Sequence, residues 1–131
     1  VDFVWGTPEA MHRRCPDRLT YRFNPRVLLV KLTLDEVTSV AERMAQRLNR
    51  AQGPTTLALP LQGVSMFDGR GGPLHQPEVN LALFRTLRAR IDDRSVELLE
   101  VDAHVNDPAF AKVCAGRLIE LLDRSHKTTT H

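Results

Sequence analysis

Residues 55–65 read TTLALPLQGVS, and residues 96–108 read VELLEVDAHVNDP. Each stretch begins as a short apolar run typical of a buried strand and ends in a polar loop that leads into an amphipathic segment. Open α/β sheets bind their ligands at this place, outside the carboxyl ends of the strands. These two strand ends therefore decide the fold class and the position of the candidate site.

Strand-like and helix-like patterns alternate on either side of these stretches. Between residues 26 and 124 the order is strand, helix, strand, helix, strand, helix, which favours right-handed crossovers. We expect an α/β fold, a Rossmann-like three-layer sandwich with a mainly parallel sheet. Asn24–Pro25 marks a turn or a kink, so the segment around it could be a hairpin or one bent strand. The predicted strands are 1–5, 19–23, 26–32, 55–59 and 96–101, and the predicted helices begin at the capping box Thr33–Glu36, at Pro77 and at Asp107–Pro108.

Length and composition predict one small domain. The chain has 131 residues and a formal charge of +2, which gives no sign of a nucleic-acid or membrane partner. It begins without a methionine on an apolar run, which predicts a piece of a longer polypeptide or a processed one. We expect residues 1–124 to form the carboxyl-terminal α/β subdomain of a two-subdomain protein, and residues 125–131 to form a flexible tail.

The two cysteines, Cys15 and Cys114, stand far apart and lack the spacing of metal ligands. They favour a reducing, cytoplasmic location over a disulfide framework. No apolar run approaches the ~20 residues that cross a bilayer. Aromatic residues fall in strand and helix patterns, so no specific nucleic-acid site is expected.

The loop that follows residue 60 is rich in glycine. Glycines let the main chain approach a ligand and turn its amides toward an anion. Neither a Walker loop nor the G-x-G-x-x-G fingerprint is present. The alternative is an ordinary long connection whose glycines satisfy turn geometry. The candidate ligand-binding residues of this loop are Gly63, Ser65, Asp68, Arg70, Gly71 and Gly72.

The second loop carries Asp102, His104, Asn106 and Asp107 within six positions. His104 and Asn106 are candidate ligand donors, and His104 is also the one candidate catalytic acid or base. The alternatives are a buried histidine that bonds to a main-chain carbonyl and, for Asn106, a turn-forming residue in a left-handed conformation. Asp107 is expected to cap the helix that follows it. A metal centre across the two loops is conceivable, but no pair has a local ligand spacing, so no metal site is predicted.

These motifs together resemble one known family. The ordered run of RLNRAQGP at 47–54, LPLQGVS at 59–65, DGRGGP at 68–73 and DAHVNDPAFA at 102–111 is similar to the carboxyl-terminal subdomain of the tomato mosaic virus resistance protein-like ATP-binding family. The resemblance implies a two-subdomain Rossmann-like protein that binds ATP with magnesium when whole. It implies no established reaction. The chain departs from the family pattern at Gln76 and Asn80, where carboxylates are typical.

We therefore expect a subdomain that forms one wall of a cleft for a nucleotide or another small anionic ligand. Its partners would be the amino-terminal subdomain of the same polypeptide and, in a homo-oligomer, a second copy of the chain. No cofactor site is evident in these residues by themselves. Two alternatives are a hydrolase or lyase that uses His104, and a dimerisation or protein-interaction module.

Overall fold

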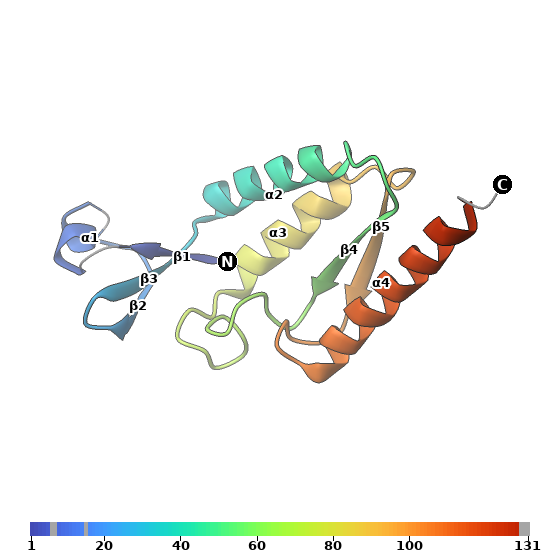
Figure 1. The fold of residues 1–131 in the computed structure, drawn as a ribbon. Coiled ribbons are helices and arrows are strands. Elements are labelled where there is room, and N and C mark those ends of the chain that lie inside the picture. Colours follow the sequence, from blue (N-terminus) through green and yellow to red (C-terminus); the bar gives the residue numbers. More distant parts are fainter. Residues whose placement is uncertain (6–7, 15, 129–131) are drawn as a thin grey trace.

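The computed structural model describes residues 1–5, 8–14 and 16–128, so Cys15 and the last three residues of the expected tail lie outside the described part. Figure 1 shows an antiparallel unit beside a helix-covered parallel sheet. In chain order the elements are β1 (Asp2–Trp5), α1 (Pro8–Arg14), β2 (Thr20–Asn24), β3 (Val27–Lys31), α2 (Leu34–Leu48), β4 (Thr55–Pro60), α3 (Pro77–Arg90), β5 (Val96–Val101) and α4 (Pro108–Thr128).

The first three strands form an antiparallel sheet in the order β1-β3-β2. β2 and β3 are a hairpin around Asn24–Pro25, with a bulge between Arg22 and Asn24, which settles the alternative that the sequence left open. The short helix α1, which the strand and helix patterns did not predict, covers this sheet with Met11. Met11 is buried against Leu28 and Val30 of β3.

The second sheet consists of β4 and β5, which pair in parallel from Thr55 opposite Val96 to Pro60 opposite Val101. Helix α3 connects them, as expected for a βαβ crossover. The α/β class is thus confirmed. Among the described residues the parallel pairing covers only these two strands, because both edges of β3 are already occupied by its antiparallel neighbours and β3 cannot pair with β4.

Helices α2 and α3 lie side by side on one face of the parallel sheet, and α4 lies on the other (Figure 1). Helix α2 begins as predicted: the Thr33 hydroxyl accepts from the Glu36 N–H at 3.3 Å, and the Glu36 carboxylate accepts from the Thr33 N–H at 2.9 Å. Such a reciprocal cap satisfies two amides that the first turn leaves open. The main core lies between these helices and β4, and comprises Val37, Ala41, Ala45, Leu59, Val79, Leu83, Phe84 and Leu87.

Helix α4 begins at Pro108, as predicted, and runs to Thr128, four residues past the boundary expected at residue 124. No proline follows Pro108 in this segment, and its one glycine, Gly116, does not end the helix. Within the described ranges, none of the helices combines the length and apolar character that crossing a membrane requires.

Candidate ligand-binding site

The glycine-rich loop after β4 is built around the carboxylate of Asp68, which is 1 % exposed. Its Oδ1 accepts the main-chain N–H groups of Val64 and Ser65, each at 3.0 Å. Its Oδ2 lies 3.0 Å from the Asn80 amide nitrogen and 3.3 Å from the Lys31 ammonium nitrogen. One side chain therefore fixes the loop to β3 and to the first turn of α3.

The electrostatics of this anchor favour the charged carboxylate. Burial alone would raise the pKa of Asp68, but the Ser65 N–H, the Lys31 ammonium and the Asn80 amide together hold it below its usual value. Lys31 is itself only 1 % exposed. The pair is thus a desolvated ion pair, whose separation would leave an unpaired charge inside the protein.

His104 ties the second loop to the first. Its Nε2 donates to the Ser65 carbonyl at 2.9 Å, and its Nδ1 accepts the Asn106 N–H at 3.2 Å. A carbonyl only accepts, so the first bond assigns the ring proton to Nε2. The Val105 N–H also donates to the Gly63 carbonyl at 2.9 Å. The Nε2 of His104 therefore joins the two loops, whereas its Nδ1 holds the main chain of the second loop itself.

Gly63 stands where these loops are closest. Its φ is +143°, a conformation that side chains rarely adopt, and a Cβ there would lie 2.5 Å from Cδ2 of His104 and 2.9 Å from Oδ1 of Asp68. Gly72 is restricted by the loop itself, since a Cβ there would lie 2.4 Å from the Phe67 carbonyl oxygen. Two of the glycines are thus required by packing within the loops.

A hollow of about 320 Å³, the polar hollow, opens beside this anchor, and polar and apolar groups contribute about equally to its lining. Arg70 is exposed at its wall and has no ion pair within the residues that the structure describes. His75 donates from Nδ1 to the Asp68 carbonyl at 2.9 Å, which directs its ring to the same wall. The hollow is lined by Leu61, Gln62, Asp68, Arg70, His75, Pro77, Asn80, Leu81 and Phe84.

Three consecutive main-chain amides of the loop, those of residues 69–71, have no acceptor in the described part of the chain. Gly71 among them has a φ of +80° and open space around its Cα. Main-chain amides without an acceptor and an arginine without an ion pair, in one turn, are groups that attract anions. The polar hollow and this turn together form the candidate site.

Most of the residues predicted from the sequence lie in or between the two loops. Some of them are used in contacts within the protein, and the others lie at its surface. Gly63, Ser65, Asp68, Gly72 and His104 make contacts within and between the loops. Arg70 and Gly71 lie at the surface of the glycine-rich loop, and Asn106 is exposed on the second loop. Their roles as ligands stay predictions.

Asp107 combines two features at the start of α4. Its carbonyl accepts the Ala111 N–H at 3.1 Å, as the carbonyl of an N-cap residue does. Its carboxylate accepts the His104 N–H at 2.8 Å instead of an N–H of the helix. The side chain therefore stabilises the second loop. In the described ranges no three histidine, cysteine, aspartate or glutamate side chains lie close enough to hold a metal ion.

Sequence reasoning missed Lys31 as a part of this site. It considered His75 only as one ligand of a conceivable metal centre with His104, Asp68 and Asp102, and it noted Asn80 only as a departure from the family pattern. Lys31 ends an otherwise apolar strand, VLLVK, and a buried lysine there requires a buried counter-ion. That requirement was the available signal for Lys31. The residues around Asn80 give no such signal of contact with Asp68, because only the tertiary fold places the first turn of α3 against the loop.

Comparisons with known proteins show the family of this chain. The model of the "Uncharacterised protein family (UPF0261) C-terminal domain" matches residues 1–122. The chain belongs to the UPF0261 family. It is 31 % identical over 125 residues to a UPF0261 protein of Clostridium tetani, and 37 % identical over 120 residues to one of Rhizobium meliloti.

The relatives are much longer than this chain. The match covers 95 % of the chain but 31 % of the Clostridium tetani protein, and 88 % of the chain but 30 % of the Rhizobium meliloti protein. A ToMV resistance protein, Tm-1(GCR237), of Solanum lycopersicum is 28 % identical over 127 residues, which are 17 % of its length. The chain thus corresponds to a C-terminal part of larger UPF0261 proteins, in agreement with the resemblance seen in its motifs.

Proposed function

We propose that this UPF0261 domain forms one wall of a cleft that binds a small anionic ligand. The observation that carries the proposal is the turn at residues 69–71: in the described part of the chain its three main-chain amides have no acceptor, and Arg70, which has no ion pair there, lines the hollow. The buried carboxylate of Asp68 acts as a positioning group for this turn. His104 has a similar role, since its two ring nitrogens bond to main-chain groups.

A nucleotide phosphate is the ligand that the family resemblance implies, with magnesium as its companion. The open amides and Arg70 fit phosphate oxygens, which take bidentate guanidinium bonds. The Asp68 carboxylate does not fit a magnesium ion, because its oxygens already accept two N–H groups and the Lys31 ammonium lies 3.3 Å away. The proposal therefore rests on the anionic part of the ligand alone.

The remainder of the cleft is proposed to come from the rest of the polypeptide or from a second copy of the chain. Both ring nitrogens of His104 are already hydrogen-bonded, so the proposal contains no reaction that uses His104 as an acid or a base. The cytoplasmic location and the homo-oligomer also stay predictions.

Calorimetric titration of the full-length protein tests this proposal. We expect ATP, with or without magnesium, and inorganic pyrophosphate to bind, because the triphosphate or diphosphate is the part recognised. Replacing Arg70 with alanine should weaken binding at least about tenfold, the loss expected for one charge-assisted contact. The matched control is Arg85→Ala, an exposed arginine of α3 outside the hollow, which should leave the affinity unchanged. No heat at saturating ligand, or equal affinities for the two variants, would refute the proposal.

A further inference from the structure

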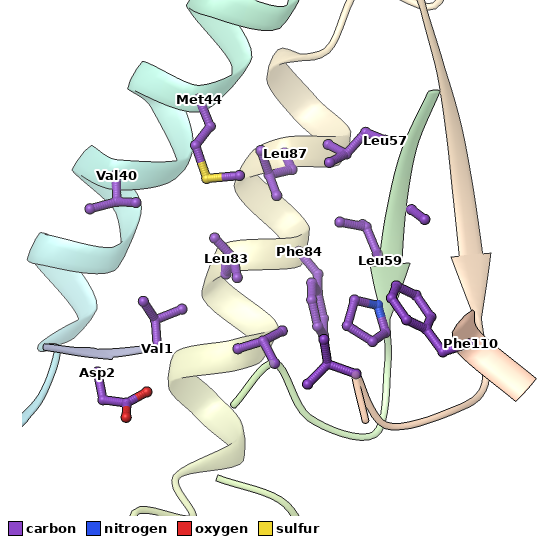
Figure 2. Close-up of a pocket in the computed structure, with 14 residues that line it drawn as sticks. Val1, Asp2, Val40, Met44, Leu57, Leu59, Leu83, Phe84, Leu87 and Phe110 are labelled. Carbon is purple, nitrogen blue, oxygen red and sulfur yellow. The ribbon is translucent and has the colours of Figure 1, made fainter. Parts of the chain in front are cut away.

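A second hollow, about 400 Å³ in volume, lies beside β4 (Figure 2). Four consecutive residues of that strand, 57–60, line it. Successive residues of a strand point to opposite faces, so a hollow reached by all four must open along the edge of the strand. Apolar side chains lie on both sides of this edge: Leu83, Phe84 and Leu87 come from α3, and Phe110 comes from α4.

The edge of β4 along this hollow has no partner strand in the described residues, since β4 pairs with β5 alone. The Leu61 N–H donates to the Val101 carbonyl at 2.9 Å, toward β5. Because N–H groups alternate in direction along a strand, the N–H of Ala58 points to the other edge. Parallel sheets are normally covered on both faces and contain more than two strands. Pro60 has no N–H, so the donors that this edge of β4 can offer to a neighbouring strand are the N–H groups of Thr56 and Ala58.

The helices lead to the same conclusion. Two packed helices lie about 8–10 Å apart, whereas neighbouring strands lie about 4.8 Å apart, so a pair of helices covers roughly four strands. Helices α2 and α3 pack side by side over only two strands (Figure 1). Val40 and Met44 of α2 project toward the hollow and are each 38 % exposed (Figure 2). Helix α2 thus extends past the sheet, over the place that a further strand next to β4 would take.

We propose that a β-strand from the remainder of the same polypeptide pairs with the free edge of β4 and fills this hollow. The length of the relatives supports that occupant, because the chain spans only about 30 % of the bacterial UPF0261 proteins that it matches. Val1 also lines the hollow, so a segment on its amino side would start beside this edge. The lining is almost wholly apolar, which suits the alternating apolar side chains of a buried strand.

Hydrogen exchange of the full-length protein, read at single-amide resolution, tests the pairing. We expect the Ala58 N–H to exchange at least about a hundredfold more slowly than an unprotected amide, as in an interior strand. Exchange at the unprotected rate would overturn the proposal. Protection that appears only at concentrations where light scattering detects a dimer would also overturn it, because the occupant would then be a second copy of the chain.

Proline at position 58 gives an independent readout. Proline is tolerated where a strand edge faces solvent, and it disrupts a strand that donates to a neighbour on that side. In the full-length protein, Ala58→Pro should therefore accelerate exchange throughout β4, whereas the control Ala58→Ser should not. If both variants exchange like the parent protein, the edge is bare and the proposal fails.

Discussion

The ion pair between Lys31 and Asp68 is expected to stabilise the glycine-rich loop, and its contribution to the free energy of unfolding can be measured. Lys31 Nζ and Asp68 Oδ2 lie 3.3 Å apart, and both side chains are at most 1 % exposed. At that distance the attraction is about 5 kcal/mol for an effective dielectric constant of about 20, before the cost of desolvation. The Asn80 amide and the N–H groups of Val64 and Ser65 offset part of that cost at the carboxylate.

Asp68→Asn keeps the shape of the side chain and removes its charge. The Lys31 ammonium then stays buried without a counter-ion, and we expect the free energy of unfolding to fall by about 3–5 kcal/mol. Lys31→Met should cost less, about 2–3 kcal/mol, because the carboxylate keeps its other hydrogen-bond donors, among them the Val64 and Ser65 N–H groups and the Asn80 amide. The double variant should be more stable than the sum of the single effects predicts, by about 2 kcal/mol or more.

The assay is urea-dependent hydrogen exchange on the full-length protein, read on peptides from α2, α3 and β4. These peptides report on the unfolding of this domain even when the rest of the polypeptide unfolds separately. Effects of the two single variants that add within about 0.5 kcal/mol would refute the reasoning, since additivity means that the two groups do not interact.

Three further predictions concern the same loop and the last helix. Gly63→Ala should lower the free energy of unfolding by about 2–4 kcal/mol, because position 63 has a φ of +143° and a Cβ there would lie 2.5 Å from His104. Gly71→Ala should lower it by about 1 kcal/mol, because position 71 has a φ of +80° but nothing lies within 4 Å of a Cβ there. Equal losses for the two variants in urea-dependent exchange would contradict this account. The folded-state pKa of Asp68 is lowered, so its charge stabilises the domain at a pH above the unfolded pKa, and this contribution is lost as the pH falls below about 4. The free energy of unfolding should therefore decrease over that range in the parent protein, and less in Asp68→Asn. Parallel pH profiles of the two proteins would argue against this expectation. Gly116→Ala should stabilise α4 by about 0.5–1 kcal/mol, since Gly116 lies inside the helix with open space around its Cα, and a thermal midpoint that does not rise would count against that expectation.

Local patterns predicted the elements well, because each element depends on residues near to it in the chain. The capping box at Thr33, the proline at position 77 and the Asp107–Pro108 pair set the beginnings of three helices at the predicted places. Alternation of strand and helix gave the α/β class. It did not give the separate antiparallel sheet, because the pairing of β3 with β1 and β2 depends on distant contacts that periodicity does not encode.

In the candidate site, too, the sequence predicted the local features but not the contacts between distant residues. The sequence located both loops and identified Asp68, Arg70 and His104 as residues to consider. It interpreted Gly63 and Ser65 as groups that face a ligand, whereas the structure turns Gly63 against His104 and uses the Ser65 N–H for Asp68. Lys31 and Asn80 reach the site from β3 and α3, and only the tertiary fold brings them there.

The central claim is that the turn at residues 69–71 receives an anion. Hydrogen exchange of the full-length protein, with and without saturating ATP or pyrophosphate, tests it at the site itself. The account predicts slower exchange in peptides that cover residues 68–75, for both ligands, and unchanged exchange in α4. Unchanged exchange at residues 68–75, or protection that appears only elsewhere in the protein, would contradict the claim.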